Sequence, residues 1–127
     1  MADYLIAFDG NAPDPAGTGD TKSWFFYYKW RPDEEDEVFV PVGVDEFECA
    51  VAGDHLWFSM DGELVGGTIL IRTTFDPFNG RKEMWFCTQH CIRTAPVKVD
   101  PDVKSGPISK ELALQFTGQI LVENPAP

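Results

Sequence analysis

The chain has 127 residues, of which 43% are hydrophobic, and it carries a formal net charge of −11. This length suits one domain with a hydrophobic core, and the hydrophobic content excludes wholesale disorder. No apolar run approaches the roughly 20 residues needed to cross a bilayer. The initial stretch MADYLIAFDGN lacks the basic region of a signal peptide. We therefore expect a cytoplasmic protein with no membrane partner.

The acidic residues are concentrated in the first two thirds of the chain. Residues 1–80 hold 16 acids and 4 bases, whereas residues 81–127 hold 5 acids and 6 bases. Contacts with phosphates supply most of the affinity of non-specific nucleic-acid binding, so a chain this acidic is a poor candidate for that function.

The first part of the chain alternates extended stretches with loops. Residues 3–8 (DYLIAF) form a short apolar run that predicts a strand. Residues 9–21 are rich in Gly, Pro, Asp and Asn, which predicts a long mobile loop. Residues 22–30 (KSWFFYYKW) predict an aromatic strand, and residues 31–37 a solvated connection. Residues 38–44 contain a proline, which favours an edge strand.

A β-hairpin is the clearest element of the sequence. Strands at residues 55–60 and 63–72 are joined by Asp61-Gly62, and this dipeptide supplies the positive φ angles that a two-residue turn requires. A loop at residues 73–82 leads to a further strand at residues 83–92. We therefore expect a three-stranded meander.

Two short helices are predicted. The first covers residues 45–54, where the initial aspartate caps the helix and Gly53 ends it. The second covers residues 108–116, with Ser109 as its N-cap and Gly118 in the left-handed conformation after its last turn.

The remaining elements complete one domain. Residues 119–122 predict a last strand before a tail at residues 123–127. No internal repeat or second domain is evident, so we expect residues 1–127 to form a single domain. About six strands and two short flanking helices indicate an α+β fold built on a curved sheet or a partly open β-barrel.

The order of motifs in residues 51–86 resembles a known superfamily. Gly53-Asp54 opens a strand after a short helix, Gly66-Gly67 lies within the next strand, and Met84-Trp85-Phe86 begins another. This arrangement is similar to the PUA-like superfamily, and most similar to its EVE and YTH domains, over roughly residues 3–100. The resemblance implies a partly open β-barrel that binds a modified base, flipped out and held between aromatic rings.

The resemblance also implies a set of ligand-binding residues. Trp24 corresponds to the pocket tryptophan on which the base stacks, and Phe75 or Phe78 would close the pocket from the other side. Hydrogen bonds to the edge of the base would come from Asp9, Asn11 and Ser23. We therefore expect a binding domain for a modified nucleobase or a nucleotide-like ligand. Its phosphates would contact Lys22, Arg81, Lys82 and Arg93, on the less acidic side.

The main enzyme alternative centres on the segment GDTKSW at residues 19–24. It resembles the Gly-x-Lys segment of the related ASCH domains, which supplies a catalytic lysine for amide hydrolysis at a modified cytidine. Lys22 would then act as nucleophile or base. A lysine beside a strand is more often a solvated end residue, so we favour binding over catalysis.

The segment CTQHC at residues 87–91 invites comparison with a zinc site. On a strand, Cys87 and Cys91 face one way and His90 the other, and no fourth ligand has a matching spacing. An odd number of cysteines without an export signal instead predicts reduced thiols. We expect no metal and no cofactor.

A third function class rests on the acid-rich residues 33–48. Consecutive acids, as in DEEDE, are typical of a solvated loop rather than a metal site. These residues would contact a basic protein partner in a binding mode that weakens with salt. The domain would then be a protein-interaction module.

Overall fold

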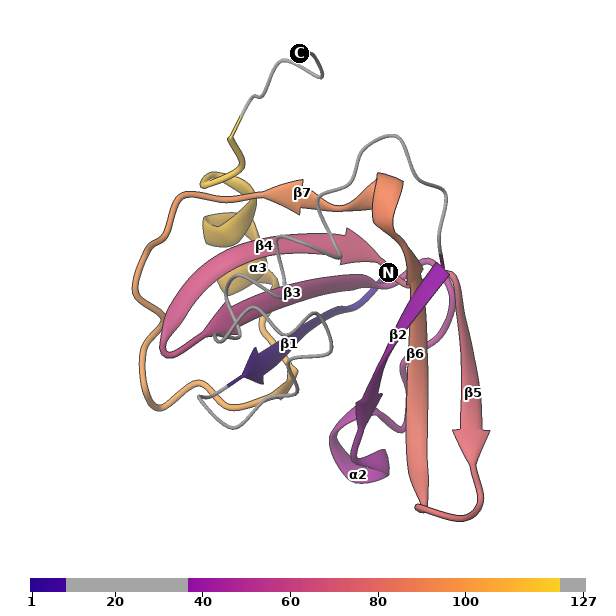
Figure 1. The fold of residues 1–127 in the computed structure, drawn as a ribbon. Coiled ribbons are helices and arrows are strands. Elements are labelled where there is room, and N and C mark those ends of the chain that lie inside the picture. The colour runs from indigo at the N-terminus through magenta and orange to yellow at the C-terminus, as the bar shows by residue number, and fades with distance from the viewer. Residues whose placement is uncertain (9–36, 122–127) are drawn as a thin grey trace.

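The structure is a computed structural model and describes residues 1–8 and 37–121. Over these residues the fold is α+β and rich in strands, which form a five-stranded and a three-stranded sheet (Figure 1). The strand order is β7-β4-β3-β1-β8 in the first sheet and β2-β6-β5 in the second. The described strands do not close into a barrel. The expected α+β class is therefore confirmed, while the PUA-like arrangement stays a prediction.

The bounds of the elements are as follows. The five-stranded sheet consists of β1 (Asp3–Phe8), β3 (His55–Met60), β4 (Glu63–Ile69), β7 (Ile92–Arg93) and β8 (Gly106–Pro107). The three-stranded sheet consists of β2 (Glu37–Val42), β5 (Arg72–Asp76) and β6 (Arg81–Cys87). The helices are α2 (Val44–Phe47), the 3-10 turn η1 (Thr88–His90) and α3 (Lys110–Thr117). In the described part of the chain, no helix is long and apolar enough to cross a membrane.

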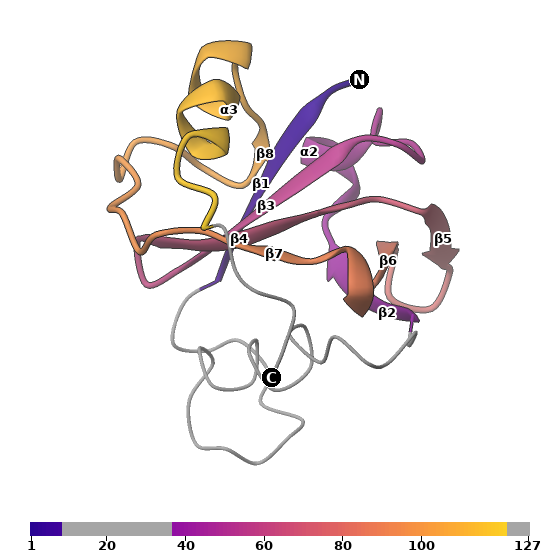
Figure 2. The ribbon, with the colours of Figure 1, turned by 90° about the horizontal axis from the view of Figure 1, so that it is seen from above.

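Alternating side chains on β1 and β3 divide the hydrophobic core into two layers. The two strands run parallel, so Leu5 lies opposite Trp57 and Ile6 opposite Phe58. Leu5 and Trp57 pack with Phe116 of α3, whereas Ile6 and Phe58 face the core shared with the three-stranded sheet. Figure 2 shows α3 beside the five-stranded sheet and away from β2, β5 and β6. Both faces of the five-stranded sheet are therefore covered.

The predicted hairpin is confirmed at its turn. Asp61 and Gly62 have φ angles of 51° and 82°, and they join β3 to β4. The packing of Trp57 explains the second glycine of the Gly66-Gly67 motif, because a Cβ atom at position 67 would lie 2.8 Å from Cε3 of Trp57. Only a glycine leaves room for the indole ring at this point of β4.

The predicted loop at residues 73–82 is wrong for most of its length. Residues 72–76 form strand β5, and only four residues separate it from strand β6, which begins at Arg81. The Asp76 carboxylate accepts hydrogen bonds from the backbone N of Phe78 at 2.9 Å and from Nδ2 of Asn79 at 2.7 Å. The turn residues Pro, Asn and Gly therefore form the tight turn of a β-hairpin between β5 and β6, and not a long loop.

The predicted three-stranded meander is also wrong, because the chain changes sheets after β4. The backbone N of Leu70 donates to O of Asp54, next to the five-stranded sheet, at 2.9 Å. The next residue, Ile71, donates to O of Trp85 in the three-stranded sheet at 2.8 Å. Strand β6 therefore pairs with β2 and β5 rather than with β4. Among the described strands, the proline-containing strand β2 lies at an edge of its sheet, as predicted.

The helices are only partly as predicted. Helix α2 has four residues, it begins after Gly43, and no side chain caps it. The predicted N-cap of α3 is confirmed, since Ser109 Oγ accepts from the backbone N of Leu112 at 3.1 Å. Gly118 has a φ of −66°, so the left-handed conformation predicted for it is wrong. In place of the last strand predicted at residues 119–122, Ile120 forms an isolated bridge.

Candidate ligand-binding site

The three-stranded sheet has one face on the core and one face turned away from it. Strand alternation directs Val40 and Val42 of β2, and Met84 and Phe86 of β6, into the core between the two sheets. The alternate residues on these strands and on β5 point to the opposite side. We call this surface the outer face and define it by Phe39, Pro41, Arg72, Thr74, Glu83 and Trp85.

An aromatic row crosses the outer face. Trp85 lies opposite Phe39 on one neighbouring strand and opposite Arg72 on the other. The ring centroids of Phe39 and Trp85 are 4.8 Å apart. The guanidinium carbon of Arg72 lies 4.0 Å from the Trp85 ring centroid, within cation–π range. Phe39 remains 42% exposed, so its ring is accessible to a flat ligand.

A chain of side-chain hydrogen bonds fixes the indole ring of Trp85. Its Nε1 donates to Oγ1 of Thr74 at 2.7 Å, and the Thr74 hydroxyl donates in turn to Oε1 of Glu83 at 2.7 Å. Glu37 holds the guanidinium of Arg72 from the side, with 3.1 Å between its Oε2 and Nη2. The aromatic row is thus oriented before any ligand arrives.

A groove of about 480 Å³ extends from Phe39 toward the turn between β5 and β6. The residues that line it are Phe39, Pro41, Asp76, Asn79, Arg81 and Glu83. This volume lies within the range of roughly 300–1,000 Å³ that is typical of small-molecule sites.

Arg81 is the cationic group of the groove. The carboxylates near it are engaged elsewhere, since Asp76 accepts hydrogen bonds from its own turn and Glu83 accepts one from Thr74. Within residues 1–8 and 37–121, Arg81 makes no hydrogen bond or ion pair. Its planar guanidinium is therefore accessible to an anionic group such as a phosphate.

Five of the residues named from the sequence lie outside the described residues. They are Asp9, Asn11, Lys22, Ser23 and Trp24. The pocket tryptophan, the base-edge contacts and the amidohydrolase alternative therefore stay predictions.

The two phenylalanines expected to close the pocket lie on the β5–β6 hairpin. Phe75 is 58% exposed and alternates with Thr74 and Asp76, so it points to the side opposite the outer face. Phe78 is 96% exposed at the turn and does not line the groove. The structure brings neither ring toward the aromatic row.

The described phosphate candidates lie apart from one another. Arg81 lines the groove, whereas Lys82, the next residue on β6, points to the other side of the sheet. Nζ of Lys82 donates to the backbone O of Phe47 at 2.7 Å and of Ala50 at 2.9 Å, which stabilises the end of α2. Arg93 belongs to β7 in the other sheet. Among these three, Arg81 alone accompanies the aromatic row.

The residues of the aromatic row, Phe39, Trp85 and Arg72, are not among the site residues predicted from the sequence, although two strand patterns contain a signal for them. Phe39 alternates with valines in EVFVPV, and Trp85 alternates with hydrophobic residues in KEMWFC. Alternation therefore places both aromatics on the polar side of their strands, together with Glu37 and Glu83. An aromatic residue on the polar side of a strand is the signal that could have identified this face.

The CTQHC segment bends at the end of β6. Residues 88–90 form the turn η1, and Sγ of Cys91 donates to the backbone O of Cys87 at 3.8 Å. All three cysteines of the chain are free thiols, with Cys49 exposed. No group of three or more His, Cys, Asp or Glu side chains in the described residues could hold a metal ion.

The described part of the acid-rich segment lies at the surface. Glu37, Asp45, Glu46 and Glu48 are exposed. A contact of residues 33–48 with a basic protein stays a prediction.

Tyr4, a residue of the hydrophobic core, has a shifted pKa. Burial raises the pKa of the Tyr4 phenol above the ordinary tyrosine value, and the charges of Asp54 and Cys49 add to the rise. The Tyr4 ring packs against Phe47, with 5.8 Å between their centroids. This tyrosine therefore stays protonated as part of the packing between the sheets.

Comparison of the chain with models of known protein families, with curated proteins and with solved structures returned no match. The likeness to the PUA-like superfamily therefore rests on the sequence motifs, and the case for a function rests on the geometry of the site.

Proposed function

We propose that this protein binds a nucleotide-like ligand, or a modified nucleobase, on the outer face of its three-stranded sheet. The observation that carries the proposal is the row of Phe39, Trp85 and Arg72 beside a groove with an accessible guanidinium. The base would stack on Phe39, at the exposed end of the row. The phosphate would pair with Arg81 in the groove.

Each part of the proposed site matches a known contribution to base recognition. Aromatic rings and guanidinium planes stack on bases, and stacking contributes about 1–3 kcal/mol per base. The carboxylates of Asp76 and Glu83, and the amide of Asn79, line the groove. Their hydrogen bonds within the protein use only part of their capacity, so their remaining lone pairs would accept from donors on the base edge. These residues are the elements by which one base would be distinguished from another.

The size and charge of the site favour a single nucleotide over a long strand. The groove volume of about 480 Å³ suits one small ligand. A single nucleotide presents few phosphates to a chain with a net charge of −11, so repulsion is smaller than for a polymer. The exposed free thiol of Cys49 supports a reducing compartment, and we propose the cytoplasm.

Calorimetric titration with nucleoside monophosphates, nucleosides and modified bases tests this proposal. Phe39→Ala should weaken binding between about fivefold and 150-fold, the equivalent of one stacked base. Arg81→Gln should weaken the monophosphate about tenfold and leave the nucleoside unchanged. Phe78→Ala is the matched control, because it removes an exposed ring that does not line the groove.

Two results would overturn the proposal. One is the absence of binding of every ligand to the wild-type protein at millimolar concentration. The other is an equal effect of Phe39→Ala and Phe78→Ala on affinity. Urea unfolding of each variant shows whether misfolding causes the loss of affinity.

A further inference from the structure

The described strands leave four sheet edges, at β2 and β5 of one sheet and at β7 and β8 of the other. An edge strand presents unpaired backbone N–H and C=O groups, and natural proteins protect it with a proline, a charged side chain, a short length or a covering segment. Strand β2 contains Pro41, and β8 has only two residues, of which one is Pro107. These two edges therefore carry their own protection.

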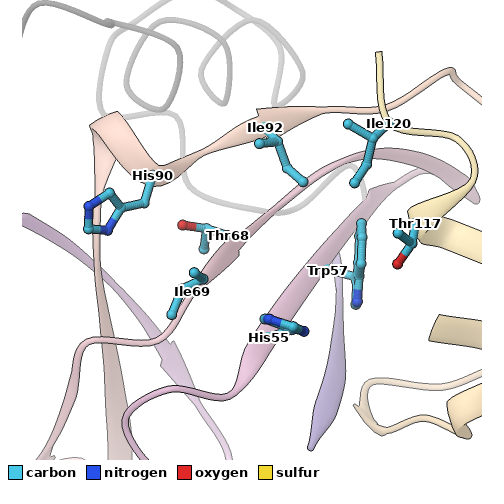
Figure 3. A pocket seen from close by; sticks show the side chains of 8 residues that line it. All are labelled: His55, Trp57, Thr68, Ile69, His90, Ile92, Thr117 and Ile120. Carbon is cyan, nitrogen blue, oxygen red and sulfur yellow. The ribbon is translucent and has the colours of Figure 1, made fainter. Parts of the chain in front are cut away.

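The edge at β7 is covered by the chain itself. This strand has two residues, and the backbone N of Leu121 donates to O of Arg93 at 2.9 Å. Ile92 of β7 and Ile120 line one pocket of about 200 Å³ together with Trp57 (Figure 3). The segment after α3 thus lies along this edge and shares its apolar side chains.

Strand β5 has none of these protections. It has five residues, without proline or lysine, and among the described strands it pairs only with β6, so it lies at the outer side of its sheet (Figure 1). Phe75 on this strand is 58% exposed, on the side opposite the outer face. A strand edge without a described partner, next to an exposed aromatic ring, is suited to pairing with a further strand.

The sequence of β5, RTTFD, is complementary to itself in an antiparallel arrangement. When Thr74 lies opposite Thr74 of a second copy, Arg72 lies opposite Asp76, and Thr73 lies opposite Phe75. Residues opposite one another in such a pair share a sheet face, with Cβ atoms about 4.5–5.5 Å apart. Opposite charges, and an aromatic ring beside a β-branched side chain, both stabilise this pairing. Two-fold symmetry makes each of these two contacts twice.

The charged groups at the two ends of β5 retain capacity for a partner. Glu37 accepts from one N–H group of Arg72, whose guanidinium has five. The two carboxylate oxygens of Asp76 accept one hydrogen bond each from the turn, at Phe78 and Asn79, and each oxygen has a second lone pair. Both side chains can therefore form an ion pair across the edge without losing their contacts within the chain.

We propose that the β5 edge binds a second copy of this chain in this register. The two three-stranded sheets then form one six-stranded antiparallel sheet, with the two β5 strands at its centre. Because paired residues share a face, the two outer faces lie on the same side of the joined sheet. The proline-containing strand β2 is left at both ends, so the assembly closes at two copies. Dimer formation does not require a ligand on the outer face.

Sedimentation equilibrium of the full chain over a range of concentrations tests this assembly. The contact covers one short strand edge, so we expect a reversible dimer with a dissociation constant in the micromolar range. The net charge of −11 on each copy opposes association, so the ionic strength is kept at about 0.15 M, where the Debye length is about 8 Å. A monomer mass at every concentration up to the millimolar range would overturn the proposal.

Two exposed phenylalanines of the same hairpin provide a matched pair of variants. Phe75→Ala should weaken the dimer about tenfold, because the symmetry removes two aromatic contacts at once. Phe78→Ala should leave the dimer unchanged, since this residue is 96% exposed in the turn and lies outside the paired strand. Equal effects of the two substitutions would contradict pairing through β5.

Charge reversal tests the register. Arg72→Glu and Asp76→Lys should each weaken self-association at least about tenfold, because like charges then face one another at both ends of the edge. A mixture of the two variants should associate again, since every opposing pair in the mixed dimer has opposite charges. Association restored by mixing requires that both chains are folded, and far-UV circular dichroism of each variant checks this directly. Folded variants that do not associate when mixed would exclude the proposed register.

Discussion

The two sheets each place a tryptophan in a hydrogen-bonded setting, but they bury it to different extents. Trp57 on the five-stranded sheet is 4% exposed beneath α3, with its ring 5.6 Å from that of Phe116. Trp85 on the three-stranded sheet is half-buried between Phe39 and Arg72, on a face that α3 does not cover. Each indole N–H donates to a neighbouring side chain, Asp3 or Thr74.

This comparison shows that burial, more than local hydrogen bonding, separates a core tryptophan from a surface one. An indole packed on both faces contributes mainly to stability, because water is removed from nearly all of its apolar surface. An indole in an exposed row keeps aromatic surface available for a ligand. The same residue type therefore supports folding in one sheet and, in the function we propose, recognition in the other.

The largest expected effect comes from truncating the two tryptophans separately. Trp57→Ala should lower the free energy of unfolding by about 3–5 kcal/mol, as is usual for a large core residue. Trp85→Ala should lower the free energy of unfolding by about 1–2 kcal/mol, because the ring of Trp85 is only half-buried and the substitution removes one hydrogen bond. Urea unfolding followed by far-UV circular dichroism measures both values. Equal losses of stability would remove the distinction between the two sheets.

A smaller effect tests how closely Trp57 is packed. Gly67→Ala should cost about 1–3 kcal/mol, because the added Cβ would meet the indole at 2.8 Å and force it to move. Gly118→Ala is the control, since its φ of −66° suits alanine and its nearest contact would be 3.4 Å. Thermal unfolding and near-UV circular dichroism report the two changes. An unaltered Trp57 signal with full stability in Gly67→Ala would contradict the close packing.

The smallest effect appears only at high pH and concerns the layer that the two sheets share. The pKa of Tyr4 is raised in the folded protein, mainly by burial, so the unfolded chain releases this proton first as the pH rises. The contribution to stability is complete below the ordinary tyrosine pKa of about 10 and is lost as the pH rises through the folded-state value. Stability should therefore fall more steeply above pH ~10 in the wild type than in Tyr4→Phe. Parallel pH profiles, measured by denaturant unfolding, would show that Tyr4 is not responsible.

Predictions from the sequence succeeded where a few neighbouring residues decide the conformation. The Asp61-Gly62 turn depends on the φ angles of two residues, and the N-cap of α3 depends on one hydroxyl three residues before an amide. The edge position of β2 follows from a missing N–H donor at Pro41. Each of these features can be read within a short window of sequence.

The failures involve residues that are distant in sequence. Strand β5 lies in a segment that the sequence predicts as a loop, because the turn residues from Asp76 to Gly80 dominate the local pattern. The change of sheet at Leu70 and Ile71 depends on hydrogen bonds to Asp54 and Trp85, which no local pattern contains. The expected pocket residues Phe75 and Phe78 lie on this same hairpin, so the error in the strand carried over to the site.

By itself, the sequence determined the α+β class, the turn between β3 and β4, the start of α3 and the alternation that places Phe39 and Trp85 opposite the core. The tertiary structure decided which strands share a sheet and which face of the three-stranded sheet points away from the core. It also brought the carboxylate of Asp3 within 3.2 Å of the imidazole of His55, although the two residues are 52 positions apart in the sequence. Local conformation depends on dihedral preferences of adjacent residues, whereas strand pairing and burial depend on contacts between segments that only the folded chain brings together.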